Sequence, residues 1–459
     1  MQRVEACIAA HRLGLGPKPG DLGRISRDPR GWALAQIKAP VQTPESLTVF
    51  PSSRERLRQI ISLEGPGNET GQRAALIARE VGNPEIVAQY QHRLVTDTPL
   101  VERMVAFWCN HFAVARNKSH NRAIASSYAT EAIRPHVFGR FADLLFAAET
   151  HPAMAMYLDN AISVGPNSLV GQRRQKLDIN ENLAREILEL HTLGVDGGYS
   201  QEDVEQLALI LTGWSFTRRE FGKIAQQLAE RRGVTLSEEF GPATFIEPLH
   251  EPGSKTLLGK TYSEDGPGEF RAVAEDLARH PSTATFIATK LVRHFVADEP
   301  PVRDVERVAG VFRETDGDLA AVTSAVVELD TLWSTPLTKA KTPQDFVVAS
   351  LRAIDHDKMT VQTLNGALAP MGQQPLMFPS PQGWPDTADK WLSPGTLMRR
   401  IEYSHQLSRR INNRVKPDLL LEWTIGPVAS RETRALVAGA PSGVDAVAYV
   451  FASREFQRR

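Results

Sequence analysis

The stretch NENLAREILELHTLGVDGGYSQEDVEQLALILTGW, residues 180–214, decides the fold class of this chain of 459 residues. Apolar residues recur in it at spacings of three and four, which is the period of an amphipathic helix. Gly194 and the pair Gly197–Gly198 can adopt the positive backbone angles that end a helix. Ser200 and Asp203 resemble a capping box, with Asp in place of the usual Glu. The stretch therefore predicts two helices joined by a tight loop.

The same period continues on both sides of this stretch, and proline often stands at a first helical position. Asp28 followed by Pro29 predicts one helix start, and Thr98 followed by Pro99 predicts another. In the helix after Pro99, spacings of three and four place five side chains on one face. That face consists of Leu100, Met104, Phe107, Trp108 and His111.

Three segments depart from the helical period. Residues 216–242 are strongly charged and predict a surface insertion that carries its own helix. Residues 243–262 contain two β-prone runs around the turn signal EPGS and predict a small β-hairpin. Residues 366–396 are rich in Pro and Gly and predict an irregular loop. The expected fold class is mainly α, with one hairpin and one charged helical insertion.

Composition excludes several classes of protein. Lys and Arg total 53 and Asp and Glu total 54, and a net charge near zero argues against a nucleic-acid binder. Cys7 and Cys109 are the two cysteines, so there is no disulfide framework. The chain shows no apolar stretch of the ~18 residues that a membrane span needs, and no secretory signal. These features predict a cytoplasmic protein.

Several segments together resemble the bacterial family catalogued as domain of unknown function 1800. They are residues 180–214, RMVAFWCNHFAV at 103–114, HPAMAMYLDN at 151–160, HPSTATFIATKLVRHFV at 280–296 and PSPQGWPD at 379–386. The resemblance covers nearly the whole chain. It implies a mainly helical fold and a single domain over residues 1–459, and it implies no activity.

The resemblance also implies a context. Members of that family often neighbour a second family, domain of unknown function 1501, which looks related to sulfatases and alkaline phosphatases and often carries an export signal. A protein of that second family is therefore an expected partner. Export together with such a signal-bearing partner is the alternative to a cytoplasmic location.

The helix at 180–193 carries the first candidate site. Asn182, Glu186 and Glu189 share one side of it, and Arg185 and His191 flank that side. Two carboxylates on one helix face can bind a divalent metal or divide acid and base roles. The alternative is a solvated face, or carboxylates that pair with arginines elsewhere in the fold.

Two histidines outside that helix are further candidates. His111 lies on an apolar face and is expected to point inward, either bonded to a carboxylate such as Glu186 or acting with it as a metal ligand. The alternative is a core histidine with a structural partner. His250 is expected to be exposed at the hairpin turn, with Lys255 near enough to meet an anion. The alternative there is an ordinary surface turn.

These candidates give three hypotheses of function. The first is a metal-assisted hydrolase or another acid–base enzyme, with a divalent metal as the cofactor it could use. The second is a non-catalytic partner of the sulfatase-like protein. The third is a module that binds a glycan or another small molecule. In the first, the catalytic residues are Glu186, Glu189 and His191, and the metal is held by His111 and Glu186. The residues expected to hold a substrate there are Asn182, Arg185, His250 and Lys255. In the third, Trp384 and Trp391 of the loop 375–391 stack on the ligand, or else they fill the core.

Overall fold

Helices dominate the computed structural model, which describes residues 2–61, 69–118, 120–173, 178–216, 243–412 and 414–459. The described strands form two sheets of two strands each. The prediction of a mainly α fold with a small hairpin is therefore confirmed. The charged insertion expected at 216–242 lies outside the described residues, apart from Phe216. In the part of the chain that the structure describes, no helix is long and apolar enough to cross a membrane.

Among the N-terminal helices, the one that starts at Pro29 begins where sequence chemistry predicts. Asp28 precedes the third of them, and its carboxylate accepts a hydrogen bond from the backbone N–H of Gly31. This bond satisfies one of the N–H groups that a helix start leaves open. These helices are α1 (Gln2–Ile8), α2 (Asp21–Ile25), α3 (Pro29–Lys38), α4 (Glu45–Thr48), α5 (Ser53–Ile61), α6 (Glu69–Ile77) and α7 (Asn83–Val95).

The central helices include the stretch at 180–214. The capping box at Ser200 and Asp203 is present as predicted. The first helix of the stretch, however, continues into a wider π-helical segment, η7 (Ile187–Thr192). The central helices are α8 (Pro99–His111), α9 (Asn121–Ile124), α10 (Phe141–Thr150), α11 (Pro152–Tyr157), α12 (Asn182–Glu186) and α13 (Gln201–Leu211).

The strands correct the prediction of one hairpin centred on EPGS. The antiparallel pair of β1 (Trp214–Ser215) and β2 (Thr244–Phe245) brackets the undescribed segment. The hairpin itself consists of β3 (Lys255–Leu257) and β4 (Lys260–Tyr262). Leu258 and Gly259 make its turn, both with positive φ. The turn lies a few residues after EPGS because Gly259 can adopt a positive φ without steric cost.

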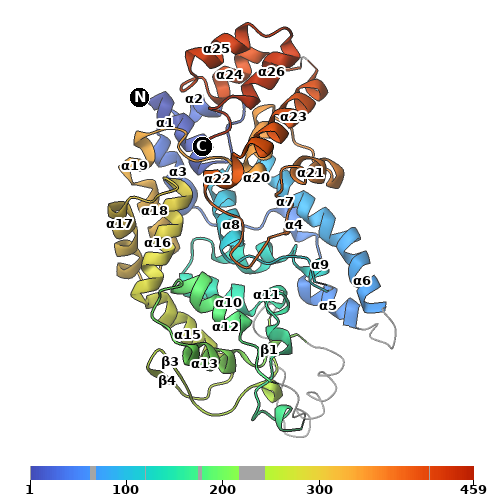
Figure 1. The fold of residues 1–459 in the computed structure, drawn as a ribbon, viewed down its shortest axis with the longest axis vertical. Coiled ribbons are helices and arrows are strands. Elements are labelled where there is room, and N and C mark those ends of the chain that lie inside the picture. The colour runs from blue at the N-terminus through green and yellow to red at the C-terminus, as the bar shows by residue number, and fades with distance from the viewer. Residues whose placement is uncertain (1, 62–68, 119, 174–177, 217–242, 413) are drawn as a thin grey trace.

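Helices on the left of Figure 1 follow the hairpin, and the C-terminal helices form the top of the molecule. The first group is α15 (Pro267–Arg279), α16 (Pro281–Phe295), α17 (Val302–Glu314), α18 (Leu319–Val327) and α19 (Asp330–Ser334). The second is α20 (Pro343–Ala353), α21 (Val361–Leu368), α22 (Ala388–Trp391), α23 (Pro394–Ile411), α24 (Pro417–Thr424), α25 (Arg431–Ala438) and α26 (Gly443–Ala452).

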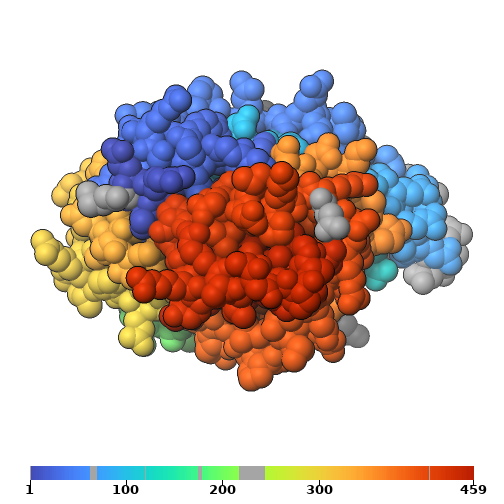
Figure 2. All heavy atoms as spheres, turned by 90° about the horizontal axis from the view of Figure 1, so that it is seen from above, coloured from blue at the N-terminus to red at the C-terminus, as the bar shows by residue number. Residues whose placement is uncertain are grey.

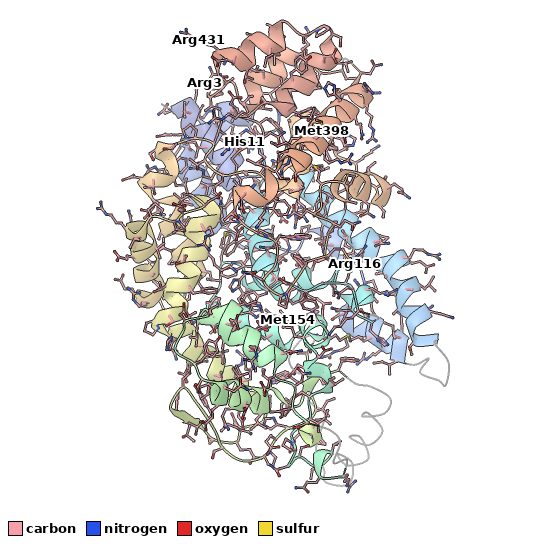
Figure 3. All side chains as sticks on the ribbon, viewed as in Figure 1. Arg3, His11, Arg116, Met154, Met398 and Arg431 are labelled. Atoms are coloured by element: carbon pink, nitrogen blue, oxygen red, sulfur yellow. The ribbon has the colours of Figure 1, made fainter. Side chains whose placement is uncertain are left out.

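Two hydrophobic clusters form the interior. The larger one draws on residues from Ala6 to Trp333. The smaller one combines α7 with α20, α21 and the last four helices. Seen from above, these C-terminal helices cover the middle of the face, with N-terminal segments beside them (Figure 2). Met154 marks the lower part of the molecule, and His11 and Met398 mark the upper part (Figure 3). The number of domains stays a prediction.

Candidate functional site

His111 points inward, as the apolar face of α8 predicts. It is 1% exposed, and burial lowers its pKa well below the usual value. Its Nε2 lies 3.0 Å from the backbone carbonyl oxygen of His191. The expected carboxylate partner is therefore wrong, because a carbonyl on η7 occupies that place. A neutral imidazole can donate to this carbonyl, so one tautomer is fixed.

His191 is fully buried, which corrects its expected place beside the exposed side of the helix. His191 follows the buried residues Leu183 and Ile187 at spacings of four, so helix geometry places it on their apolar side, away from Asn182 and Glu186. Its Nδ1 lies 2.8 Å from Oε1 of Glu149 on α10. The contact is off the hydrogen-bond direction, so neither atom gains a hydrogen bond within the described residues.

Glu186 borders this buried pair and is half-buried. Desolvation raises its pKa, and the nearby carboxylates of Glu189 and Glu149 raise it further, against an opposing effect of His191. The structure thus brings Glu186, His191 and His111 near one another, and it adds Glu149. Among the residues that the structure describes, no three His, Cys, Asp or Glu side chains are arranged to hold a metal ion. The metal at His111 and Glu186 stays a prediction.

Three of the expected residues lie at the surface of this region. Asn182 is exposed. Arg185 donates to Glu181 at 2.8 Å and to Gln201 at 3.0 Å, and neither of these partners is one of the candidate carboxylates Glu186 and Glu189. Glu189 is half-exposed. Their roles in substrate binding and catalysis stay predictions.

His250 and Lys255 are buried, which corrects the expected exposed turn. His250 is 6% exposed and Lys255 is 2% exposed. The Lys255 ammonium lies 3.1 Å from the carboxylate of Glu269 and 3.3 Å from Nε2 of His250. A buried ammonium must be paired, and Glu269 on α15 pairs it. The hairpin therefore packs against the helix instead of projecting into solvent.

A cavity of about 110 Å³ lies between the two hydrophobic clusters. Its walls come from α7, α8, α16 and α20, together with the loop at 373–386. Trp384 lines it, whereas Asn182, Arg185, His250 and Lys255 do not. The structure therefore separates Trp384 from the other residues that the sequence predicts to bind substrate.

The loop at 373–386 is fastened to α8 at one point. The side-chain amide of Asn110 donates to the backbone carbonyl of Trp384 at 2.9 Å. The backbone N–H of Trp384 donates in return to Oδ1 of Asn110 at 2.7 Å. Gly383 has a φ of +82°, and a Cβ there would lie 2.2 Å from the carbonyl oxygen of Asn110. Only glycine permits so close an approach. Leu376, with a φ of +54°, shows that the loop also carries backbone strain.

The aromatic ring of Trp384 lies against the ring of Phe378, with 6.0 Å between centroids. Its indole N–H is buried and has no hydrogen-bond partner in the described ranges. The indole N–H of Trp391, in contrast, donates to the carbonyl of Pro385 at 2.8 Å. The indole N–H of Trp108 is another buried donor without a partner in the described ranges, but Trp108 does not line the cavity, whereas Trp384 does.

Charged side chains make up another wall. The carboxylate of Asp345 on α20 lies 3.2 Å from Arg103 and 3.3 Å from Arg459. These two guanidinium groups hold the pKa of Asp345 well below its usual range, against the desolvation that raises it. Arg93 also lines the cavity. It forms no ion pair with a described carboxylate, and its Nε is buried without a hydrogen-bond partner.

A histidine and an aspartate complete the wall. Nδ1 of His294 on α16 lies 3.2 Å from the carboxylate of Asp386. Burial, and then the nearby charge of Arg459, lower the pKa of His294 to about 4. Hydrogen bonding to His294 keeps the pKa of Asp386 below its usual value although desolvation raises it. At neutral pH this pair is therefore a neutral imidazole beside an ionised carboxylate.

Comparison with known proteins fits the architecture described above. The family described as "Protein of unknown function (DUF1800)" matches residues 8–458. This chain belongs to the DUF1800 family. The match spans both hydrophobic clusters and every wall of the cavity. Neither a curated protein nor a solved structure matches the chain.

Sequence reasoning missed most of the cavity in this DUF1800 protein. His294 and Asp386 lie in the family-like segments 280–296 and 379–386, but they are 92 residues apart. Asp345 lies in none of the family-like segments. One feature of the sequence could have pointed to the cavity. Trp384 and Asp386 follow Gly383 in the segment 379–386, and a glycine there permits the positive φ that the loop adopts.

Proposed function

We propose that the central cavity binds a small organic anion and that the pair His294–Asp386 exchanges a proton with it. This makes the protein an acid–base enzyme, as the first hypothesis from the sequence expects, but at a different place. The residues that line the cavity carry the proposal. Trp384 and Arg93 each have a buried donor without a hydrogen-bond partner in the described ranges, and both residues line the same cavity as the pair His294–Asp386.

The charges around the cavity favour an anion. Arg93 and Arg103 line the cavity together with the carboxylates of Asp345 and Asp386. Arg459 does not line it but pairs with Asp345 from behind, and Arg93 forms no ion pair with a described carboxylate. Counted with Arg459, three guanidinium groups face two carboxylates, which suits a ligand rich in acceptors. Phe107 and Phe378 offer apolar surface for the remainder of the ligand.

A bound anion would prepare His294 for proton transfer. A neighbouring negative charge favours the protonated imidazole, so it moves the pKa of His294 up from about 4. Asp386 holds the ring through Nδ1 and stabilises the charge that the ring gains, whereas the guanidinium of Arg459, 3.4 Å from Nε2, opposes that charge until the anion binds. The ligand thus activates the base that acts on it.

Binding of benzoate, a flat carboxylate, tests the proposal by calorimetry and by the indole N–H signals in NMR. Trp384→Phe removes the free donor and keeps the ring. A hydrogen bond to a charged group is worth about 1.5–3 kcal/mol, so affinity should fall by about tenfold or more. Trp391→Phe is the matched control, because its N–H already has a partner. Equal affinity in the two variants, or no binding of benzoate to the wild-type protein, would contradict the proposal.

The acid–base step has a separate readout. If His294 takes up a proton with the anion, benzoate must bind more tightly as the pH falls from 8 to 5. His294→Gln should abolish this dependence and leave weaker, pH-independent binding. A pH dependence that survives in His294→Gln would remove His294 from the mechanism, even if the cavity still binds the anion.

Family membership supports a second proposal, that of a partner from the domain of unknown function 1501 family. In this proposal the chain is exported together with that signal-bearing protein, and a cytoplasmic location is the alternative. Co-expression of the two proteins with a tag on one of them is the test. Failure of the untagged protein to co-purify would reject the partnership.

A further inference from the structure

A second cavity, of about 330 Å³, lies on the other side of α20 from the central one. Val348 of α20 lines the central cavity, whereas Val347 and Leu351 of the same helix line the second. α21, α23 and the chain after each of α20 and α23 complete its walls. Met398, on the same α23, is labelled in the upper part of Figure 3. The two cavities are therefore separate spaces with one helix between them.

The inner surface of this cavity is apolar. It is built from side chains of the smaller hydrophobic cluster, and their buried parts form a continuous floor. The residues of that floor are Val347, Leu351, Met359, Leu407 and Ile411. A volume of about 330 Å³ is within the range of ligand pockets and equals the share of about eleven liquid water molecules.

The rim of the cavity is cationic. Lys358, Arg410 and Arg414 stand around it, with His356 beside them, and all four are exposed. None of the described residues that line the cavity is acidic. Within the described ranges, none of the three permanent cations forms an ion pair or a side-chain hydrogen bond. Asp355 and Asp357 are exposed on the same segment as Lys358, but they do not line the cavity, so the described part of the rim is cationic.

Interaction with helix dipoles explains only part of this rim. α23 ends at Ile411, so Arg410 lies in its last turn, where a cation is favourable. The dipole effect fades beyond that turn, however, and Arg414 and Lys358 lie outside the helices. The helix dipole therefore does not explain why Arg414 and Lys358 lie around the same apolar opening as Arg410.

We infer that this second cavity binds an amphipathic monoanion, specifically a free fatty carboxylate of medium chain length. The tail occupies the apolar floor and the carboxylate lies among Lys358, Arg410 and Arg414. Arginine can hold a carboxylate through two parallel hydrogen bonds. The limited volume restricts the tail, so a short acid lacks contacts and a long one protrudes. This site does not depend on the proposed function of the central cavity.

Calorimetric titration with decanoate tests the inference on the full chain. Decanoate should bind with a Kd below about 1 mM. The double variant Arg410→Gln/Arg414→Gln should raise that Kd about tenfold or more, and added salt should weaken wild-type binding. Both positions are exposed, and surface substitutions of this kind leave the fold intact.

Arg409→Gln is the matched control. Arg409 neighbours Arg410 on α23 and is equally exposed, but it does not line the cavity. Its Kd for decanoate should stay within twofold of the wild-type value. Decanol, which has the same tail without the charge, should bind weakly and equally to all variants. Butyrate, which has the charge without the tail, should not bind at millimolar concentrations.

Three results would overturn the inference. One is an equal loss of decanoate binding in Arg409→Gln and in the double variant. Another is equal binding of decanol and decanoate by the wild-type protein. The third is binding to phosphatidylglycerol vesicles without binding of free decanoate, which would assign the rim to a membrane surface. Loss of decanoate binding in Trp384→Phe would instead place the ligand in the central cavity.

Discussion

Asp345→Asn is the substitution that tests most directly how the chain is held together around the central cavity. The Asp345 carboxylate lies between Arg103 of α8 and Arg459, at 3.2 and 3.3 Å. The two arginines are 3% and 2% exposed. Three segments distant in sequence therefore meet at one carboxylate, and removal of its charge leaves two buried cations without their counter-ion.

The burial of these two arginines sets the expected loss in free energy of unfolding. Removal of one partner from a buried ion pair costs about 3–5 kcal/mol, because the remaining charge stays desolvated. Asn keeps the shape and one acceptor oxygen, so the loss in free energy of unfolding should be near the lower end, about 3 kcal/mol. The folded-state pKa of Asp345 is depressed. Its contribution is therefore present above the unfolded value of about 4 and is lost as the pH falls below it.

Urea denaturation followed by tryptophan fluorescence measures this loss. Asp330→Asn is the control, because Asp330 pairs with Arg30 at 3.2 Å but its side chain is 90% exposed. Exposed pairs contribute about 0–1 kcal/mol. In Asp345→Asn/Arg459→Gln one buried cation is also gone, so the double variant should lose less than the sum of the two single losses. Equal costs for Asp345→Asn and Asp330→Asn at pH 7 would refute the reasoning.

Three further predictions follow from titratable groups. Burial raises the pKa of both Cys7 and Cys109 to about 12, so neither thiol should react with a disulfide reagent at pH 8 until the protein is unfolded in urea; rapid native reaction of Cys109 would contradict this. Folding raises the pKa of Glu186, so the folded state disfavours the carboxylate and stability falls as the pH rises from about 4. Glu186→Gln should therefore stabilise the protein at pH 7 but not at pH 4. Thermal melting at both pH values checks the sign of this effect. Desolvation lowers the pKa of Lys290 to about 8, so an NMR titration of its side-chain signals should show a midpoint near that pH; a midpoint near the usual lysine value of about 10.4 would contradict this.

The sequence by itself determined the local features of this protein. The capping box of Ser200 and Asp203, the start of α3 at Asp28 and the buried face of α8 are all present. Each depends on residues within about one helical turn of one another, where the backbone period fixes which side chains meet. The family-like segments likewise determined membership of the DUF1800 family.

Two side chains that the sequence analysis placed at or near the surface are buried. His191 was grouped with the polar side of its helix, but it follows the buried Leu183 and Ile187 at spacings of four and lies against Glu149 of α10. The sequence predicts Lys255 as a surface residue of a hairpin. In the structure it is buried and pairs with Glu269 of a later helix. In both cases the deciding interaction comes from packing against another element.

Only the tertiary structure decided the two cavities and their charges. His294 meets Asp386 across 92 residues, and Asp345 meets Arg103 across 242. No spacing in the sequence encodes such pairs, because they depend on how α8, α16 and α20 pack between two hydrophobic clusters. Periodicity tells which face of each helix is buried, but the packing of those faces determines which buried charges become neighbours.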